Sequence, residues 1–230
     1  LAIAVWKRLP AFIVRRLGPY IVRGLAERES MKYTIHNLRE LSPELLPKLA
    51  DIHMGDHGLL SELGYAFVER YFQIVYHDKQ VIAVYAQNDE TGELIGYNIA
   101  APDPASLTSQ LTSERMWFIK QIIKTLFTNP AAILQLIVSS LTIQTQMKNE
   151  PDAVESLYLT VSPNYRGKGM GRVIQQGLFE AVRKEGYKRI VGSIEISNQA
   201  SINMCLANGF TITKTFREGK YTRHRIEKIL

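Results

Sequence analysis

From residue 31 onward, the apolar positions of this chain switch repeatedly between two spacings. Alternating or short continuous apolar runs are typical of strands, whereas apolar residues three and four positions apart are typical of helices that bury one face. The strand-like runs occupy 33–38, 80–87, 94–101, 155–162, 188–197, 211–216 and 223–230. The helix-like runs occupy 42–58, 65–78, 169–186 and 198–210. This pattern predicts a chain of the α/β (α+β) class.

Local signals refine two of these elements. Ser42 and Pro43 are residue types that favour the N-cap and the first position of a helix, so the first helix is expected to begin there. The segment 88–93, "NDETGE", has the composition of a turn and lies between two strand-like runs. It predicts an antiparallel hairpin.

Residues 102–150 interrupt the alternation and predict a helical insertion. Apolar residues at helical spacing occupy 114–127 and 129–146, which indicates two helices. The second contains a mostly apolar stretch over 131–143, which is shorter than the ~20 residues that cross a bilayer. A buried helix is the simpler interpretation, and a lid or a groove for an acyl chain is the alternative.

The first thirty residues form a basic amphipathic N-terminal extension. Apolar clusters alternate there with basic pairs, as in a helix that lies on a surface, although Pro10 and Pro19 interrupt it. Three interpretations stay open, namely a membrane-surface anchor, a helical appendage on the domain or a partner, and an extension that is not native to the domain. The predicted organisation is therefore an extension over 1–30 and a domain over 31–230.

Composition and charge narrow the possible classes of protein. With 230 residues and 46% hydrophobic content, the chain can bury a sizeable core in one domain. The net charge is +6, and residues 1–30, with six basic and two acidic side chains, supply +4 of it. The basic pI therefore describes the extension, and we expect no nucleic-acid partner. A single cysteine excludes an internal disulfide framework and favours a cytoplasmic location, with membrane association through 1–30 left open.

A glycine-rich and basic run, "SPNYRGKGMGR" at 162–172, lies between a predicted strand and a predicted helix. Glycine lets backbone N–H groups face a ligand without a Cβ in the way, and the N-terminus of a helix carries a partial positive charge. The order predicts a cradle for a diphosphate. Its residues are Arg166, Gly167, Lys168, Gly169, Met170, Gly171 and Arg172. The run lacks the Lys-Ser or Lys-Thr of a P-loop, and Arg172 stands where a dinucleotide fingerprint needs glycine.

Two motifs resemble those of the GNAT superfamily of acetyl-CoA-dependent N-acetyltransferases. The segment "VSPNYRGKGMGR" is similar to the family pattern V-x-P-x-x-R-G-x-G-x-G-x, and Arg166, Gly169 and Gly171 fill its central [QR]-x-x-G-x-[GA]. Downstream, the pattern N-x-x-[AS] opens a helix that closes with G-F. Its residues are Asn198, Ser201, Gly209 and Phe210. The resemblance covers 31–230, with the insertion as an elaboration, and implies a mixed, mostly antiparallel sheet flanked by helices.

The resemblance also implies how acetyl-CoA would bind as co-substrate. The backbone of 167–171 would hold the pyrophosphate, and the backbone of Val161 would pair with pantetheine. Asn198, with Ser201 beside it in the motif, would reach pantetheine as well. In the family the fourth and fifth strands splay apart at this place, and the thioester lies in the gap.

Candidates for proton transfer are fewer. Glu155 begins the fourth strand, where some family members carry a general-base glutamate; a solvated strand-end carboxylate is the alternative. Cys205 occupies the position of the family's proton-donating tyrosine, and it is either the proton donor or a small buried hydrophobe. Tyr165, Tyr221 or a water could replace it, or catalysis could rest on positioning alone.

The first helix offers candidates for the acceptor side. His53 and His57 lie four residues apart, but Met54 stands where the H-E-x-x-H motif needs glutamate, so we expect no metal. The resemblance places this helix beside the acceptor cleft. His53 or Asp56 is therefore expected to face the acceptor, with a surface loop as the alternative.

These observations predict transfer of an acetyl group to a primary amine of a small molecule or peptide, by direct attack in a ternary complex. One alternative is a membrane-surface acyltransferase that uses a longer acyl chain or a lipid-linked acceptor. Another is a non-catalytic sensor of coenzyme A, which the missing tyrosine favours. Homodimer formation stays open.

Overall fold

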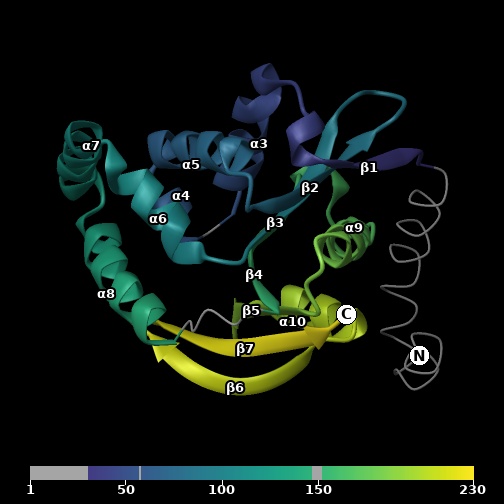
Figure 1. Cartoon of the computed structure of the whole chain (residues 1–230). Coiled ribbons are helices and arrows are strands. Elements are labelled where there is room, and N and C mark those ends of the chain that lie inside the picture. The colour runs from purple at the N-terminus through teal and green to yellow at the C-terminus, as the bar shows by residue number, and fades with distance from the viewer. Residues whose placement is uncertain (1–30, 57, 147–151) are drawn as a thin grey trace, which may run out of the picture.

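The computed structural model of the chain describes residues 31–56, 58–146 and 152–230 (Figure 1). The expected N-terminal extension over 1–30 therefore lies outside the described residues, and so do His57 and the last residues of the insertion. Within the described ranges, no helix combines the length and the apolar character that a membrane-spanning segment needs.

Among the described residues, seven strands form a single sheet (Figure 1). They are β1 Tyr33–Asn37, β2 Ile82–Asn88, β3 Leu94–Ala101, β4 Ala153–Val161, β5 Arg189–Glu195, β6 Thr211–Glu218 and β7 Tyr221–Ile229. The strands lie in the order β1-β2-β3-β4-β5-β7-β6, and only β4 and β5 run parallel to each other. The predicted mixed, mostly antiparallel sheet is confirmed, and so is the hairpin of β2 and β3.

Helices cover both faces of this sheet. They are α3 Leu46–Met54, α4 Leu59–Leu63, α5 Tyr65–His77, α6 Pro104–Ser113, α7 Arg115–Thr128, α8 Pro130–Gln146, α9 Met170–Lys184 and α10 Gln199–Ala207. Helix α9 packs against β1 to β4 and buries its apolar face, including Ile174, Leu178 and Val182. Helices α3 and α5 cover the opposite face, so the sheet separates two apolar cores.

The predicted start of the first helix is confirmed in position, but its first turn differs in type. Ser42 is the N-cap and Pro43 the first residue of a 3₁₀ turn over Pro43–Leu45, although the side chain of Ser42 makes no capping hydrogen bond, and α3 follows directly at Leu46. Pro47 explains the change of type, because it has no N–H to donate to the carbonyl four residues earlier. A proline is tolerated in the first turn, which is where α3 has it.

The predicted number of helices in the insertion is wrong, because α6 precedes the two expected ones. Its N-cap is Asp103, whose Oδ1 accepts hydrogen bonds from the N–H groups of Ala105 (3.0 Å) and Ser106 (3.3 Å). Pro104 supplies a preset first position. The helix is rich in serine and threonine, so its apolar periodicity is weak and its caps are the stronger signal.

Side-chain hydrogen bonds connect α7 and α8 of the insertion to the rest of the domain. Thr125 of α7 donates to the carbonyl of Leu63 at 3.0 Å. Ser139 of α8 donates to Oε1 of Glu218, at the end of β6, at 2.6 Å. Helix α8 is buried on the face that carries Ser139, while Leu134 and Ile137 on its other face are exposed. The insertion therefore forms a wall between α4 and the β6–β7 hairpin (Figure 1).

Candidate functional site

A gap opens between β4 and β5. The two strands pair only from Ala153 with Arg189 to Ser156 with Gly192, although both continue further. A β-bulge on β4 lies at the end of this pairing, because Ile99 opposes Tyr158 while the next residue of β3 opposes Ser156. Bulges bend the strand that carries them. The expected splay of the fourth and fifth strands is present.

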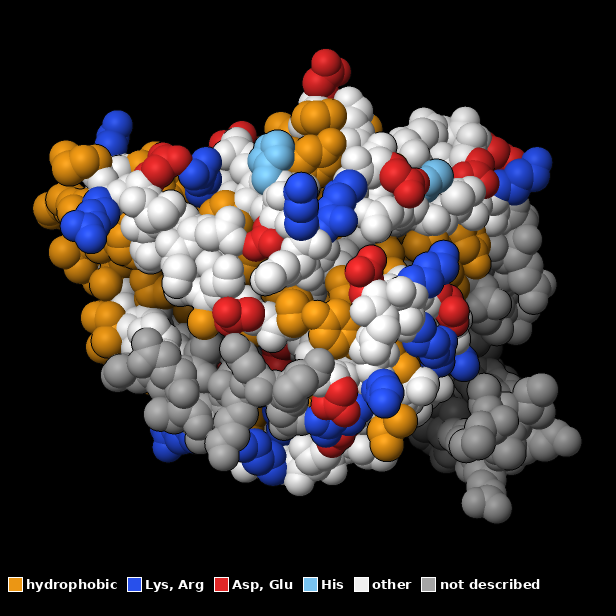
Figure 2. Space-filling model, in the orientation of Figure 1, with side chains coloured by type: hydrophobic (Ala, Val, Ile, Leu, Met, Phe, Trp, Pro, Cys, Tyr) orange, Lys and Arg blue, Asp and Glu red, His pale blue; other side chains and the backbone are white. Residues whose placement is uncertain are grey.

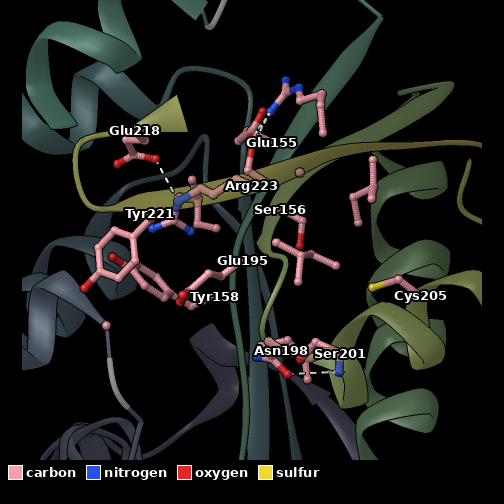
Figure 3. A pocket seen from close by; sticks show the side chains of 18 of the residues that line it. Glu155, Ser156, Tyr158, Glu195, Asn198, Ser201, Cys205, Glu218, Tyr221 and Arg223 are labelled. Atoms are coloured by element: carbon pink, nitrogen blue, oxygen red, sulfur yellow. Dashed lines mark hydrogen bonds and ion pairs between the residues drawn. The ribbon is translucent and has the colours of Figure 1, made fainter. Parts of the chain in front are cut away.

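A pocket of about 340 Å³ occupies this gap (Figure 3). Strands β4 to β7, helix α10 and the loop after α3 supply most of its wall. In the close view, Asn198, Ser201 and Cys205 lie on the α10 side, while Tyr158, Glu218 and Tyr221 lie on the opposite side (Figure 3). After the expectations from the sequence, we call the α10 side, which adjoins the start of α9 where Gly171 meets Met204, the coenzyme side, and the side formed by α3, β4, β6 and β7 the acceptor side. Val161 and the run 166–172 do not themselves line this pocket.

The glycine run turns the chain from β4 into α9. Gly167 (φ 75°) and Gly169 (φ 78°) are in the left-handed region, which glycine adopts without a steric penalty. The first N–H groups of a helix have no partner within the helix, so those at the start of α9 are available to an anion. Gly171 lets the start of α9 lie close to Met204 of α10, because a Cβ at residue 171 would lie only 2.9 Å from Sδ of Met204. The residues present fit a diphosphate.

Basic side chains surround this run, but protein groups already hold them. Nε of Arg166 donates to the carbonyl of Val161 at 2.9 Å, and Nε of Arg172 donates to Oδ1 of Asn208 at 3.1 Å. Nζ of Lys168 lies 5.7 Å from the centre of the Tyr165 ring. These cations therefore place positive charge beside the cradle while bracing it. The side chain of Met170 is buried beneath, so only its backbone can face a ligand.

The backbone N–H of Val161 and the side-chain Nδ2 of Asn198 are the two donors that the family resemblance assigns to pantetheine, and neither is used by another protein group in the contacts below. The N–H of Ser162 donates to the carbonyl of Ile95 on β3 at 2.8 Å, and backbone groups alternate along a strand. The N–H of Val161 therefore points to the other edge, toward the gap. Oδ1 of Asn198 caps α10 by accepting from the N–H of Ser201 at 3.1 Å, which leaves the Nδ2 donor to the pocket (Figure 3).

Glu155 and Cys205 both line the pocket, in buried surroundings. Oε1 of Glu155 lies 2.6 Å from Nη1 of Arg225; burial raises the pKa of the carboxyl, and the arginine opposes that rise. The alternative of a solvated carboxylate is therefore wrong. Sγ of Cys205 accepts a hydrogen bond from Nε2 of Gln175 at 3.2 Å, and burial raises the pKa of the thiol. The thiol stays protonated at neutral pH.

The two tyrosines considered as substitute acids lie in different places. Tyr165 does not line the pocket, because its hydroxyl donates to Oε2 of Glu93 at 2.6 Å on the β2–β3 hairpin. Tyr221 lines the pocket, and its hydroxyl donates to Oε1 of Glu62 at 3.1 Å. Only Tyr221 is thus within the site.

His53 is a buried residue of the acceptor side, so the surface-loop alternative is wrong for it. Its side chain is 1% exposed and lines the pocket together with Asp56. Nδ1 lies 2.5 Å from the hydroxyl of Tyr97, which donates to Oγ1 of Thr160 at 3.2 Å. Thr160 in turn donates to Oδ2 of Asp56 at 2.9 Å.

Sequence reasoning missed most of the acceptor side. Tyr158 lies on β4 beside the gap, and burial raises its pKa to about 12. Nε of Arg223 lies 2.8 Å from Oε2 of Glu218 across the β6–β7 hairpin (Figure 3). These residues follow an ordinary strand pattern, and no motif marks them. In the part of the chain that the structure describes, no three histidine, cysteine or acidic side chains cluster as a metal site would require.

Comparison with known proteins gives a consistent result. The family model described as Acetyltransferase (GNAT) family matches residues 46–210. Ribosomal-protein-alanine N-acetyltransferase from Brucella melitensis superposes with a TM-score of 0.56 at 17% identity, covering 86% of this chain and 99% of that one. A mutant spermidine N-acetyltransferase from Vibrio cholerae gives 0.54 at 10% identity, covering 86% and 93%.

A third structure, from Salmonella typhimurium, was determined with its cofactor acetyl-CoA. It gives a TM-score of 0.51 at 16% identity and covers 86% of this chain and 94% of that one. At these identities the likeness establishes the fold alone. No curated protein matches the sequence.

Proposed function

This chain belongs to the acetyltransferase (GNAT) family, and from that premise we propose that it transfers an acetyl group from acetyl-CoA to a primary amine. The acceptor would be a small molecule or a peptide, and the amine would attack the thioester directly in a ternary complex. One observation carries the proposal: the gap between β4 and β5 opens a pocket that reaches from α10 to the β6–β7 hairpin. Two substrates can therefore meet in it from opposite sides.

The residues of the coenzyme side support acetyl-CoA as co-substrate. The N–H groups from Gly167 to Gly171 would hold the pyrophosphate, and those of Val161 and Asn198 would hold pantetheine. Acetyl-CoA supplies an activated thioester carbonyl. A backbone N–H directed into the gap can polarise that carbonyl without any particular side chain.

Direct attack is also favoured by the state of the single cysteine. A nucleophilic cysteine needs a lowered pKa, and burial raises that of Cys205. A covalent acetyl-cysteine is therefore disfavoured. Cys205 as proton donor to the departing sulfur and Glu155 as proton acceptor stay predictions; the ion pair with Arg225 favours a positioning role for Glu155 instead.

The test is an acceptor screen with the full-length chain and acetyl-CoA. The panel contains alkylamines, polyamines and short peptides that begin with alanine, and the readout is free thiol released from the coenzyme. We expect release with at least one amine, and a rate lower by at least about tenfold at subsaturating acetyl-CoA with a Gly171→Val variant that stays folded. Tight binding of coenzyme A without release for any amine would contradict the proposal and favour a coenzyme A sensor.

A second candidate is an acyltransferase that works at a membrane surface, and one observation favours it. Helix α7 exposes an apolar stripe at helical spacing, formed by Met116, Ile119, Ile123 and Phe127. Lys120 and Lys124 flank the stripe, and basic amphipathic faces bind anionic lipid. Figure 2 shows the hydrophobic side chains gathered over α7 and α8, with basic ones beside them.

The two candidates separate in a sedimentation assay with vesicles that contain phosphatidylglycerol. If the stripe binds membranes, the native chain sediments with them and an Ile123→Glu/Phe127→Glu variant does not. Acetyl transfer to a soluble amine should be equal in both proteins. A native chain that stays in the supernatant would exclude this second candidate.

A further inference from the structure

The buried imidazole of His53 has one bonded and one unbonded ring nitrogen. Nδ1 contacts the Tyr97 hydroxyl, whereas Nε2 is buried without a hydrogen-bond partner. Burial lowers the pKa of His53 to about 4, although Asp56 opposes the shift, so the ring is neutral at pH 7. A neutral imidazole carries a single proton on one nitrogen. Which nitrogen holds it decides what the ring can do.

The chain of hydrogen bonds that ends at Asp56 fixes that proton. An ionised carboxylate only accepts hydrogen bonds, so Thr160, at 2.9 Å, donates its one hydroxyl proton to Asp56. Tyr97 must then donate its own proton to Thr160, at 3.2 Å. The Tyr97 oxygen is left as the acceptor for His53. Nδ1 therefore carries the hydrogen, and Nε2 carries a lone pair.

His53, which carries this lone pair, lines the pocket at its acceptor side. The rings of Phe72, Tyr97 and Tyr158 pack against the imidazole with centroids 4.9 to 6.3 Å away, so its orientation is fixed. A buried acceptor without a donor destabilises a fold, because the nitrogen has lost its water and gained no partner. An N–H of the acceptor substrate would satisfy it.

We propose that Nε2 of His53 accepts the proton of the attacking amine, and that Tyr97, Thr160 and Asp56 are positioning residues that fix its tautomer. The inference rests on the proposed function. As the amine nitrogen bonds to the thioester carbon, its proton moves to Nε2 and the C–S bond breaks. The sulfur leaves with that electron pair. The imidazolium then gives its proton to the sulfur or to water, so amine and thioester yield amide and thiol.

The hydrogen bonds from His53 through Tyr97 and Thr160 to Asp56, here called the relay, suit a proton transfer that follows the attack of the amine. A weakly basic imidazole cannot deprotonate a free alkylammonium ion, whose pKa is near ~10. The proton on the amine nitrogen becomes far more acidic once that nitrogen has bonded to the thioester carbon. Asp56, which is partly exposed at the far end of this chain of hydrogen bonds, then stabilises the imidazolium through Thr160 and Tyr97.

The tautomer is tested first, by ¹⁵N NMR of the imidazole in the native full-length chain. We expect protonated Nδ1 and unprotonated Nε2 at pH 7. Thr160→Val breaks the relay with a side chain of the same shape, and it should shift the proton toward Nε2, because Tyr97 is then free to donate to Nδ1. Protonated Nε2 in the native chain would overturn the inference.

Kinetics follow with the best amine of the acceptor screen. His53→Gln should lower kcat by at least about 100-fold, the lower range for general-base catalysis, and leave the Kd of coenzyme A unchanged. Thr160→Val should lower kcat by about tenfold at constant KM, since it disturbs only the tautomer. His77→Gln, at an exposed histidine, is the matched control. A kcat of folded His53→Gln within about twofold of native would overturn the inference.

If no amine of the panel is acetylated, the proposed function fails. An NMR titration then tests the inference about His53 separately. The ¹⁵N shift of Nε2 is then followed while n-butylamine is added to the native chain saturated with coenzyme A. A saturable shift would show that an amine reaches this nitrogen. An unchanged shift would overturn the inference.

Discussion

The two sides of the pocket are built from different parts of the polypeptide. The coenzyme side would bind through backbone N–H groups at the start of α9, where Gly167 and Gly169 adopt positive φ and Gly171 packs closely on Met204. The acceptor side relies on side chains from α3, β3, β4, β6 and β7, held by ion pairs and by the relay that ends at Asp56. A site built from backbone N–H groups tolerates the exchange of one side chain for another, but not the addition of a Cβ where glycine is needed. A site built from side chains loses its function when one of those side chains is exchanged.

The largest effect is expected at the buried pair of Glu155 and Arg225. Removing one partner, as in Glu155→Ala or Arg225→Ala, leaves the other charge buried and should reduce the free energy of unfolding by about 3 kcal/mol. Replacing both, as Glu155→Leu/Arg225→Met, should recover at least half of that loss. Urea unfolding of the four proteins measures this coupling.

An exposed ion pair provides the control for this cycle. Glu180 and Arg183 also lie 2.6 Å apart, but both side chains are largely exposed, so Glu180→Ala should change stability by less than about 0.5 kcal/mol. If Glu155→Gln instead abolished acetyl transfer without loss of stability, Glu155 would be the proton acceptor. The inference about His53 would then need revision.

Acid should weaken the acceptor side more than the coenzyme side. The folded chain resists protonation of His53 until about pH 4, whereas the unfolded chain takes up that proton below about 6.5. The stability that this group contributes is thus complete above pH 6.5 and is lost as the pH falls toward 4. Between pH 7 and pH 5 we expect a loss of about 2 kcal/mol in the native chain.

This pH dependence is measured from urea midpoints at the two pH values. The loss should shrink in His53→Gln, which has no proton to gain, and persist in His77→Gln. Equal losses in native and His53→Gln proteins would show that another group causes the acid sensitivity.

A Cβ should damage the coenzyme side without unfolding it. Gly171→Val places a side chain among Leu159, Val161 and Met204, at the start of α9. We expect at least about tenfold weaker binding of coenzyme A, or about 1.4 kcal/mol. Gly186→Asn is the control, because Gly186 (φ 86°) ends the same helix far from the pocket and asparagine tolerates that conformation. Equal affinities in the two variants would remove Gly171 from the cradle.

The smallest effect separates the two functions of Asn198. Asn198→Asp keeps an oxygen for the cap of α10 but loses the Nδ2 donor, so it should weaken binding of coenzyme A by several-fold at unchanged stability. Asn198→Ala should in addition lose about 1 kcal/mol of stability, because the cap is gone. Thermal melting and calorimetry of both, with the exposed Asn203→Ala on the same helix as control, test this.

The difference between the two sides also explains what the sequence could predict. A backbone cradle needs glycines at fixed spacing between a strand and a helix, so residues 161–172 carry its signal in one contiguous run. The sheet was predictable for a similar reason, since each strand shows its own apolar pattern. The short helix α6 was missed because its capping residue, Asp103, rather than its periodicity, defines it.

On the acceptor side, only His53 and Asp56 were expected, and from the family resemblance rather than from a local pattern. His53, Tyr97 and Thr160 are separated by more than forty residues at each step, and only the packing of α3 on the sheet brings them together. Whether Glu155 is solvated or paired depends on β7, seventy residues later. Such contacts depend on strand register and helix packing, which no local pattern encodes.

The central claim is that the amides at the start of α9 bind the pyrophosphate of coenzyme A. Calorimetry of the native full-length chain tests it with two ligands, coenzyme A and pantetheine, which lacks the pyrophosphate and the nucleotide. We expect saturable heat with coenzyme A and at least about 100-fold weaker binding of pantetheine. No heat with coenzyme A, or equal affinities for the two ligands, would contradict the account.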